Sequence, residues 1–404
     1  MRALDGVTVL DLTHMLSGPY AGQLLADLGA RVVKIEPPER GEATRRLLQT
    51  SPDYSKGGMG AYFMTLNRNK SSVALDLKSE RGLEIFHGLV AKADIVLNNF
   101  AAGVPARLKI DHATLFKINP RIITCSITGF GETGPGVHRT AFDLVAQGMG
   151  GGMAVTGEPD GPPLRSGIPI GDLGGGLFGV IGVLSALQAR STTGRGQHVD
   201  ISMADCQLSL LGYMGTMTMM SGKPPGRLGN GHFVHAPYNV YATATEHMII
   251  AVIFDTHWPA VVEALGDPAL ADPKFDAQPG RLAHKAFIDE RVQARLATRP
   301  RAHWLETFER LRVPCAPVHD IEAAFADPQA AARNMVVDVP LPNGEITQQP
   351  GNPVKLSDTY EDHYAPAPEL GAQTDAVLAE FLGLDEAALA DLAAEGVVGR
   401  GEGG

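Results

Sequence analysis

The residue whose type and setting best suit it for chemistry is Asp172. It stands in the glycine-rich segment SGIPIGDLGGGL, residues 166–177, where we expect an apolar strand to give way to an apolar helical run over residues 177–187. A carboxylate in the first turn of a helix faces unpaired N–H groups and the positive end of the helix dipole, so it stays ionised at neutral pH. An ionised aspartate is a nucleophile without an activating base, and the glycines let a bulky substrate come close. Asp172 is therefore the candidate nucleophile, although a simple helix cap would explain the same position.

Alternating strands and helices surround this segment and would position it. Short apolar runs predict strands, and longer runs closed by glycine or proline predict helices. We expect strands at residues 7–12, 31–36, 72–77, 94–98, 121–128 and 198–202, and helices at residues 20–28, 80–91, 106–118 and 204–220. This succession predicts an α/β fold with a parallel, doubly wound, Rossmann-like sheet.

Shifts in composition divide the chain into two domains. Residues 1–220 are expected to form the N-terminal part of a large Rossmann-like domain, and residues 221–232, rich in glycine and proline, a linker or loop. Residues 233–330 are expected to form a smaller α+β domain, and residues 331–404 to return to the large domain with C-terminal helices. The glycine-rich end, residues 396–404, is expected to lack ordered structure.

Composition and charge argue against several classes of protein. The 404 residues carry a net charge of −11, which disfavours nucleic acid or an anionic membrane surface as the partner. The first apolar stretch contains Asp5 and Asp11, and no uninterrupted apolar run approaches about 18 residues, so neither a signal peptide nor a membrane span is predicted. The three cysteines are widely spaced, as in proteins of a reducing compartment. We therefore expect a cytoplasmic protein.

No metal site is predicted from the histidines and cysteines. His232 lies three residues before His235, and Cys315 four residues before His319, but neither pair has an evident third ligand.

Nine short motifs occur in an order that resembles a known protein family. They occupy residues 10–19, 33–37, 67–70, 75–78, 99–103, 127–131, 142–147, 171–172 and 193–197. Each motif alone is weak, but together they are similar to those of the family III CoA-transferases, the CaiB/BaiF family, which includes formyl-CoA:oxalate CoA-transferase. The resemblance runs from residue 4 to about residue 239 and, more weakly, to residue 398.

This resemblance implies a reaction, its substrates and an assembly. In the family, the aspartate that matches Asp172 attacks an acyl-CoA thioester to give an aspartyl mixed anhydride. The CoA thiolate then forms an aspartyl-CoA thioester, from which CoA passes to a free carboxylic acid. Coenzyme A and acyl-CoA would be substrates rather than a permanently bound cofactor, and the acceptor a small acid such as a dicarboxylate. The resemblance also implies an interlocked homodimer.

Residues that contact CoA in the family have counterparts in this chain. By this resemblance the CoA contacts are His14, Met15, Leu16, Ser17, Leu75, Lys78, Asn99, Phe100, Arg107 and Met203. By pattern alone, Leu75 and Met203 would be core residues and Arg107 a solvated helix position. Pro37 stands where the family's prototype has an arginine, so we expect phosphate binding to fall to Arg40, Lys78 or Arg107.

Phe142 separates two reactions that this fold hosts. The related α-methylacyl-CoA racemases have a histidine at this position, directly before an aspartate, and use it to move a proton. Phenylalanine cannot transfer a proton, which favours CoA transfer over racemisation. Asp143 is expected either to orient the active site or to cap a helix, and Arg139 to supply a charge beside Thr140, where the family has a lysine. A non-enzymatic CoA-binding protein is the third alternative.

Residues 226–231, GRLGNG, lie where the family has a glycine-rich loop that folds over the intermediate. We interpret them either as such a loop or as a linker between domains. Asn230 and His232 would then reach the substrate from the second domain.

Overall fold

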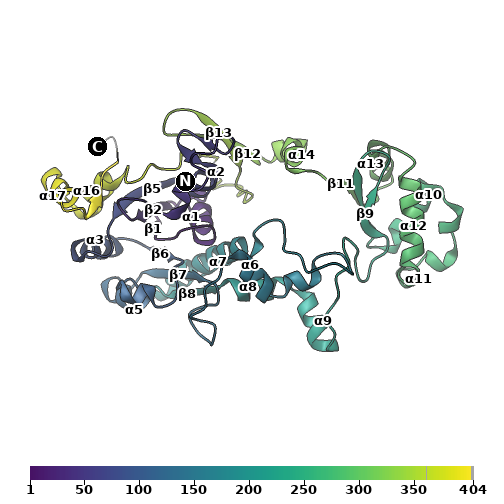
Figure 1. Cartoon of the computed structure of the whole chain (residues 1–404), viewed down its shortest axis with the longest axis horizontal. Coiled ribbons are helices and arrows are strands. Elements are labelled where there is room, and N and C mark those ends of the chain that lie inside the picture. Colours follow the sequence, from purple (N-terminus) through teal and green to yellow (C-terminus); the bar gives the residue numbers. More distant parts are fainter. Residues whose placement is uncertain (361, 402–404) are drawn as a thin grey trace. The chain divides into compact units, whose positions relative to one another are not determined.

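The computed structural model describes residues 1–360 and 362–401, which cluster into two compact units (Figure 1). Unit 1 comprises Met1–Gly152, Ser166–Gly212 and Pro328–Gly404, and unit 2 comprises Met153–Arg165 and Tyr213–Asp327. Two segments assigned to the large domain from the sequence, residues 153–165 and 213–220, thus belong to unit 2. The loop at residues 221–232 lies inside unit 2 rather than at its boundary.

A seven-stranded sheet forms the centre of unit 1 within the described residues, with the order β14-β5-β2-β1-β6-β7-β8. Its strands are β1 (Thr8–Asp11), β2 (Arg31–Glu36), β5 (Lys70–Leu75), β6 (Ile95–Asn98), β7 (Ile123–Thr128), β8 (His198–Ser202) and β14 (Val398–Gly399). All pairs are parallel except that of β14 with β5. The six parallel strands have the strand order of a Rossmann fold, which confirms the predicted fold class.

The C-terminal end of the chain differs from the expectation of disorder. Val398 pairs with Leu75, and Gly399 pairs with Ala74, so this end adds an edge strand to the sheet. Val398 is buried in the same apolar core as Leu75, and this burial offsets the chain entropy lost on ordering. Residues 402–404, for which disorder was also predicted, lie outside the described residues.

Helices cover both faces of the sheet because its strands are apolar on both sides. Leu10 and Val33 face one core, and Val9 and Val32 face the other, as the two-residue period of a strand requires. The first core is closed by α3 (Glu80–Val90), α5 (His112–Ile118), α16 (Thr374–Leu382) and α17 (Glu386–Ala394). The second is closed by α1 (Ser17–Asp27), α7 (Ile170–Thr193) and α8 (Met203–Leu210).

Two helices predicted from the sequence are each broken in the structure. Residues 106–118 form α4 (Val104–Arg107) and α5, because Lys109 takes a left-handed backbone (φ 55) and Asp111 caps α5 through the N–H of Thr114. Residues 204–220 form α8 and α9 (Tyr213–Ser221), separated at Gly212 (φ 53). The second break is also the boundary between the two units.

The glycine-rich segment is a helix rather than the predicted strand and turn. Residues 162–169 contain no strand, and α7 begins at Ile170, so the glycines after Asp172 are helical. They let α7 pack closely, since a Cβ added at Gly176 would lie 2.7 Å from the Ser17 carbonyl oxygen and one at Gly179 would lie 2.9 Å from Ile127. The glycines therefore set the distance of α7 from its neighbours, and with it the position of Asp172.

The remaining described elements of unit 1 are short. They are β3 (Ser55–Lys56), β4 (Met59–Gly60), α2 (Ala61–Asn67), α6 (Asp143–Met149), α15 (Pro328–Ala332), β12 (Val336–Pro340) and β13 (Ile346–Pro350).

Unit 2 has an α+β architecture with its own core. Its antiparallel sheet has the order β11-β10-β9 and is built from β9 (Tyr238–Ala242), β10 (His247–Ala251) and β11 (Cys315–Pro317). The helices are α9, α10 (Trp258–Leu265), α11 (Gln278–Ala283), α12 (Lys285–Leu296), α13 (Arg301–Arg310) and α14 (Ile321–Ala326). Trp258, Phe275 and Phe308 lie in a core separate from those of unit 1, as expected of an independently packed domain.

Candidate active site

The point where the sheet reverses its strand order lies between β1 and β6. In open α/β sheets, ligands bind in the crevice beyond the carboxyl ends of the strands at such a point. The turn after β1 and the end of β6 are joined there by two hydrogen bonds. The backbone N–H of His14 donates to Asn99 Oδ1 over 2.9 Å, and Asn99 Nδ2 donates to the His14 carbonyl over 2.7 Å. Asn99 therefore fixes the turn that carries the predicted CoA contacts.

Buried charged side chains also hold the turn after β1. Asp11 Oδ1 accepts the N–H of Thr13 over 2.9 Å, its Oδ2 accepts Lys70 Nζ over 2.8 Å, and Lys34 Nζ donates to the Thr13 carbonyl over 2.8 Å. Burial raises the pKa of Asp11, but the ammonium groups of Lys70 and Lys34 outweigh it and bring the pKa to about 2. Asp11 is thus ionised across the physiological range, and the turn rests on a rigid ionic support.

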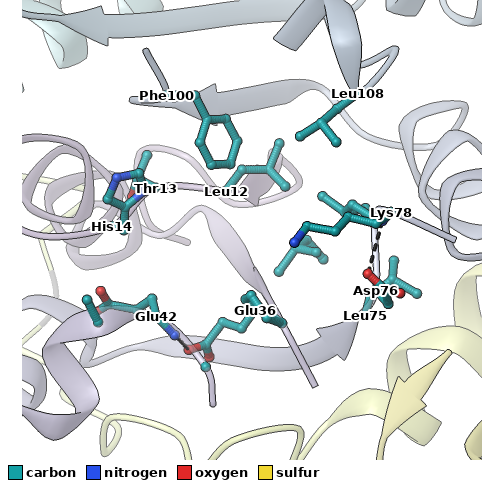
Figure 2. Close-up of a pocket in the computed structure, with 15 residues that line it drawn as sticks. Leu12, Thr13, His14, Glu36, Glu42, Leu75, Asp76, Lys78, Phe100 and Leu108 are labelled. Carbon is teal, nitrogen blue, oxygen red and sulfur yellow. Dashed lines mark hydrogen bonds between the residues drawn. The ribbon is translucent and has the colours of Figure 1, made fainter. Parts of the chain in front are cut away.

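A cavity of about 320 Å³ at this edge follows the ends of β1, β2 and β5. Figure 2 shows Phe100 and Leu108 on one side, Glu36 and Glu42 on the opposite side, and the Lys78 ammonium directed inward. Burial lowers the pKa of His14, so this imidazole is neutral at neutral pH. The apolar part of the wall suits a flat heterocycle, and Lys78 is the lining cation that could bind a phosphate, while Glu36, Glu42 and Asp76 also line the cavity.

A second cavity of about 200 Å³ shares His14 and Phe100 with the first. It contains the candidate nucleophile, Asp172. Six more of the site residues predicted from the sequence line this cavity: Met15, Ser17, Asn99, Arg139, Phe142 and Met203. The two cavities are therefore neighbours, with Lys78 lining the first and Asp172 the second.

Asp143, rather than Asp172, binds the open end of α7. Asp143 Oδ1 accepts the N–H of Gly171 over 2.8 Å and lies 3.4 Å from the N–H of Asp172. Its Oδ2 accepts Gln147 Nε2 over 2.8 Å, while Gln147 Oε1 accepts the N–H of Ser166 over 2.8 Å. A carboxylate from another helix thus satisfies the first N–H groups of α7, and the side chain of Asp172 is left to line the cavity.

The pKa of Asp172 differs from the low value that its helix position suggests. Burial raises it first, and the neighbouring charge of Asp143 adds to the effect, so that the pKa is about 6. Asp172 is still mostly ionised at pH 7, as predicted from the sequence. It is also less solvated than an ordinary surface carboxylate and hence more basic and more nucleophilic.

Several predicted site residues lie elsewhere. Leu16 is the N-cap residue of α1, and Arg107 is exposed on α4; neither lines the two cavities. Arg40 lines a separate cavity with Arg45 and Arg46, so of the three phosphate candidates only Lys78 lines the first cavity. Asn230 and His232 belong to unit 2, and their role stays a prediction.

Leu75 and Met203 are core residues, as the pattern alone indicated, and their contact with CoA stays a prediction. Each is buried in an apolar core of unit 1 and also lines a cavity. Sequence reasoning missed Glu42, whose Oε2 accepts the N–H of Met15 over 3.3 Å and supports its left-handed backbone (φ 66). It also missed Gln147. The signal for the Asp143–Gln147 hydrogen bond in the sequence is the spacing of four residues, which places both side chains on one face of a helix.

Among residues 1–360 and 362–401, no group of three or more His, Cys, Asp or Glu side chains is arranged to hold a metal ion. His232 and His235 lie 4.6 Å apart by ring centroid and pack with Tyr238 in unit 2.

The α/β fold agrees with comparisons to known proteins. Residues 4–374 match CoA-transferase family III. The chain belongs to this family. It is 41% identical to the acetyl-CoA:oxalate CoA-transferase of Acetobacter aceti over 93% of this chain and 95% of that protein. It is 36% identical to the succinate–glutarate CoA-transferase of Agrobacterium fabrum over 94% and 95% of the two chains.

A solved structure of a CaiB/BaiF family protein from Brucella suis has the same fold. The TM-score is 0.84 at 37% identity, with 94% of this chain and 99% of the other covered. The protein is therefore an enzyme, a family III CoA-transferase whose substrates are CoA thioesters. This excludes the non-enzymatic CoA-binding alternative.

Among the described helices, α7 has the length and apolar composition that could cross a membrane, and 44% of its most apolar window is buried. Core helices of soluble proteins meet the same criteria, so this is weak evidence for a span. Family III CoA-transferases are soluble enzymes.

Proposed function

We propose that this enzyme moves CoA from an acyl-CoA donor to a small free dicarboxylic acid, with Asp172 as the nucleophile. The observation that supports the proposal is that Asp172 lines the smaller cavity, which shares His14 and Phe100 with the larger one. In this arrangement the adenine end of CoA occupies the larger cavity with its phosphates near Lys78. The thioester then reaches the Asp172 carboxylate, and Phe100 and Met203 line its path.

The reaction proceeds by four acyl transfers in which every bond broken is matched by one formed. The Asp172 carboxylate attacks the thioester carbonyl, the C–S bond breaks, and a mixed anhydride and CoA thiolate result. The thiolate attacks the aspartyl carbonyl, releases the donor acid and leaves an aspartyl-CoA thioester. The acceptor carboxylate attacks that thioester to give a second anhydride and free thiolate. Attack by the thiolate on the acceptor's carbonyl then forms the new acyl-CoA and frees Asp172.

The carboxylate is better suited to this sequence than an alcohol nucleophile. An aspartyl anhydride retains the group-transfer potential of the thioester, whereas an ester would lose it. Proton transfer at the α-carbon, the racemase alternative, would need a second base at Phe142, which offers none. We therefore expect no exchange of the substrate's α-proton with deuterated solvent.

Arg139 is the cation that would recognise the acceptor. Among the residues that line the Asp172 cavity, it is the only arginine or lysine, and its guanidinium lies 4.6 Å from the ring centre of Phe130. A cavity of about 200 Å³ suits a small acid. The relatives named above act on oxalate, and on succinate and glutarate, all small dicarboxylates. Assaying CoA transfer to a panel of mono- and dicarboxylic acids tests the proposal, and transfer to none of them would contradict it.

Activity should fall in acid with a midpoint near pH 6. The ionised form of Asp172 is the nucleophile and its pKa is raised to about 6, so kcat/KM should fall about tenfold for each pH unit below that value. Asp143→Asn removes the neighbouring charge that raises this pKa and should move the midpoint to lower pH. Profiles from pH 4.5 to 8 measure both values, with Asp205→Asn, at the exposed first turn of α8, as the control. A midpoint that stays or rises in Asp143→Asn would exclude this electrostatic coupling.

We also propose that the enzyme is a cytoplasmic homodimer. Its support is a set of exposed apolar side chains on three helices that pack against one another, α6, α7 and α8: Leu144, Val145, Leu177, Ile181, Leu184, Leu208 and Leu210. Leu177, Ile181 and Leu184 have the spacing of one helix stripe, and exposed apolar surface of this kind marks an interface. Light scattering after size exclusion should give twice the chain mass, and Ile181→Glu should shift it toward the monomer. A monomeric wild type would contradict the assembly.

A further inference from the structure

The loop of residues 129–142, which joins β7 to α6, supplies a large part of the lining of the Asp172 cavity. Its larger lining side chains include Phe130, Arg139 and Phe142. The loop contains no helix or strand, and Phe142 is 64% exposed. Its backbone hydrogen bonds from Val137 to Gly134 and from Arg139 to Gly136 are internal, and its end is attached to α6, where Arg139 Nη2 lies 3.8 Å from Met149 Sδ. Its first residues attach the loop to β7 and β8.

Four polar side chains, one of them Glu132 of the loop, are linked by hydrogen bonds on the face of β7 opposite to Cys125. Glu132 Oε2 lies 3.1 Å from His198 Nε2, His198 Nδ1 lies 2.8 Å from Thr124 Oγ1, and Thr124 Oγ1 lies 2.9 Å from His112 Nδ1. Thr124 alternates along β7 with Cys125, which packs in the core against α7. The four side chains line a separate cavity of about 200 Å³.

The N–H and O–H donors of His112, Thr124 and His198 can all be directed toward Glu132 in the loop. The hydrogen bond from His198 lowers the pKa of Glu132, so its carboxylate is ionised at neutral pH and accepts the Nε2–H of His198. His198 Nδ1 can then accept the hydroxyl proton of Thr124, and the Thr124 oxygen can accept the Nδ1–H of His112. Burial lowers the pKa of His112, and the nearby His198 lowers it further, which keeps His112 neutral. The other titratable groups facing the chain are Asp111, His138 and Asp200.

Glu132, which these hydrogen bonds hold, lies close in sequence to Phe130, the residue on whose ring Arg139 packs. The backbone N–H of Glu132 donates to the Asp200 carboxylate over 3.0 and 3.2 Å, and the N–H of Gly131 donates to Thr128 Oγ1 over 2.8 Å. Phe130 is two residues earlier, and its ring carries the guanidinium of Arg139. A displacement of Glu132 would therefore be passed through Phe130 to Arg139.

We propose that the chain Glu132–His198–Thr124–His112 is a positioning device that fixes the 129–142 loop so that Arg139 meets the carboxylate of the acceptor acid. The inference rests on the proposed function, because Arg139 matters in this way only if the second substrate is an acid that binds beside Asp172.

The test is the effect of Glu132→Ala on each of the two substrates. Its KM for the acceptor acid should rise roughly tenfold or more, since small displacements of binding groups are costly, while the KM for acyl-CoA stays within about twofold. Glu132→Gln should restore most of the loss, because its amide oxygen still accepts the His198 N–H. His198→Ala should match Glu132→Ala, and the double variant should be no worse than either. His138→Ala, in the same cavity but outside the chain of hydrogen bonds, is the control.

Amide hydrogen exchange gives a readout that does not depend on activity. Residues 129–142 should exchange faster in Glu132→Ala than in the wild type or Glu132→Gln. Unchanged exchange there, equal changes in both KM values, or additive effects in the double variant would overturn the positioning role. If the wild-type enzyme transferred CoA to no carboxylic acid, the proposed function would fail instead, and the exchange measurement would still decide whether Glu132 holds the loop.

Discussion

Replacing Asp172 by alanine or asparagine should lower CoA transfer by roughly four orders of magnitude or more, the scale seen when a covalent nucleophile is removed. Neither replacement can form an anhydride, and no other carboxylate lines the cavity among its described residues. The substituted enzyme should still bind acyl-CoA, because the predicted CoA contacts lie along the other walls. The loss should thus appear in kcat rather than in the affinity for acyl-CoA.

The intermediate itself can be trapped. Wild-type enzyme incubated with acyl-CoA and then with hydroxylamine should carry a hydroxamate at Asp172, located by mass spectrometry. Asp172→Asn should carry none, whereas Asp205→Asn, with its substitution at the first turn of the adjacent helix, should be labelled like the wild type. A label on another residue, or activity within tenfold of the wild type in Asp172→Ala, would remove Asp172 from this role.

Loss of folding can be separated from loss of chemistry. Burial makes the charged form of Asp172 unfavourable, as its raised pKa shows, so a neutral asparagine removes that cost. The thermal midpoint of Asp172→Asn should therefore equal or exceed that of the wild type near pH 7. A substantially lower midpoint would attribute the loss of activity to instability.

Replacing Arg139 by alanine should raise the KM for a dicarboxylate acceptor by roughly 10- to 100-fold. Charge-assisted hydrogen bonds contribute about 1.5–3 kcal/mol each, and this substitution removes those between the guanidinium and the acceptor's far carboxylate. A monocarboxylate acceptor of similar length lacks the far carboxylate, so its KM should change little. The KM for acyl-CoA should also be nearly constant.

The matched control for Arg139 is Arg195→Ala. The Arg195 guanidinium also stacks on a phenylalanine, 4.9 Å from the ring centre of Phe116, but Arg195 lines neither cavity. Its loss should leave both KM values unchanged. Equal effects of Arg139→Ala on mono- and dicarboxylates would show that Arg139 supports the loop without recognising the far carboxylate.

The strands of the large sheet could be predicted, and Asp172 chosen as the candidate nucleophile, because the signals are local. Runs of β-branched residues, such as those around Val9, Val32 and Ile123, mark buried strands. The six strands predicted in this way are the six parallel strands of the sheet. The breaks at Lys109 and Gly212 were missed because the apolar pattern continues through them, while the chain turns to bury Ile110 or to enter unit 2. The added strand at Val398 was missed because a glycine-rich end carries no signal until it meets the edge of β5.

The sequence alone determined the fold class and the candidate nucleophile, since each depends on residue types within a few positions of one another, and the turns expected to carry CoA came from the resemblance of nine short motifs to a family. Tertiary structure decided the environment of Asp172. Asp143 lies 29 positions earlier, yet it satisfies the first N–H of α7 and helps to raise the pKa of Asp172 to about 6. Likewise, Glu132 meets His198 only because β7 and β8 pair side by side. Electrostatic and hydrogen-bond energies depend on distance in space, and it is the packing of α6 and α7 that sets that distance.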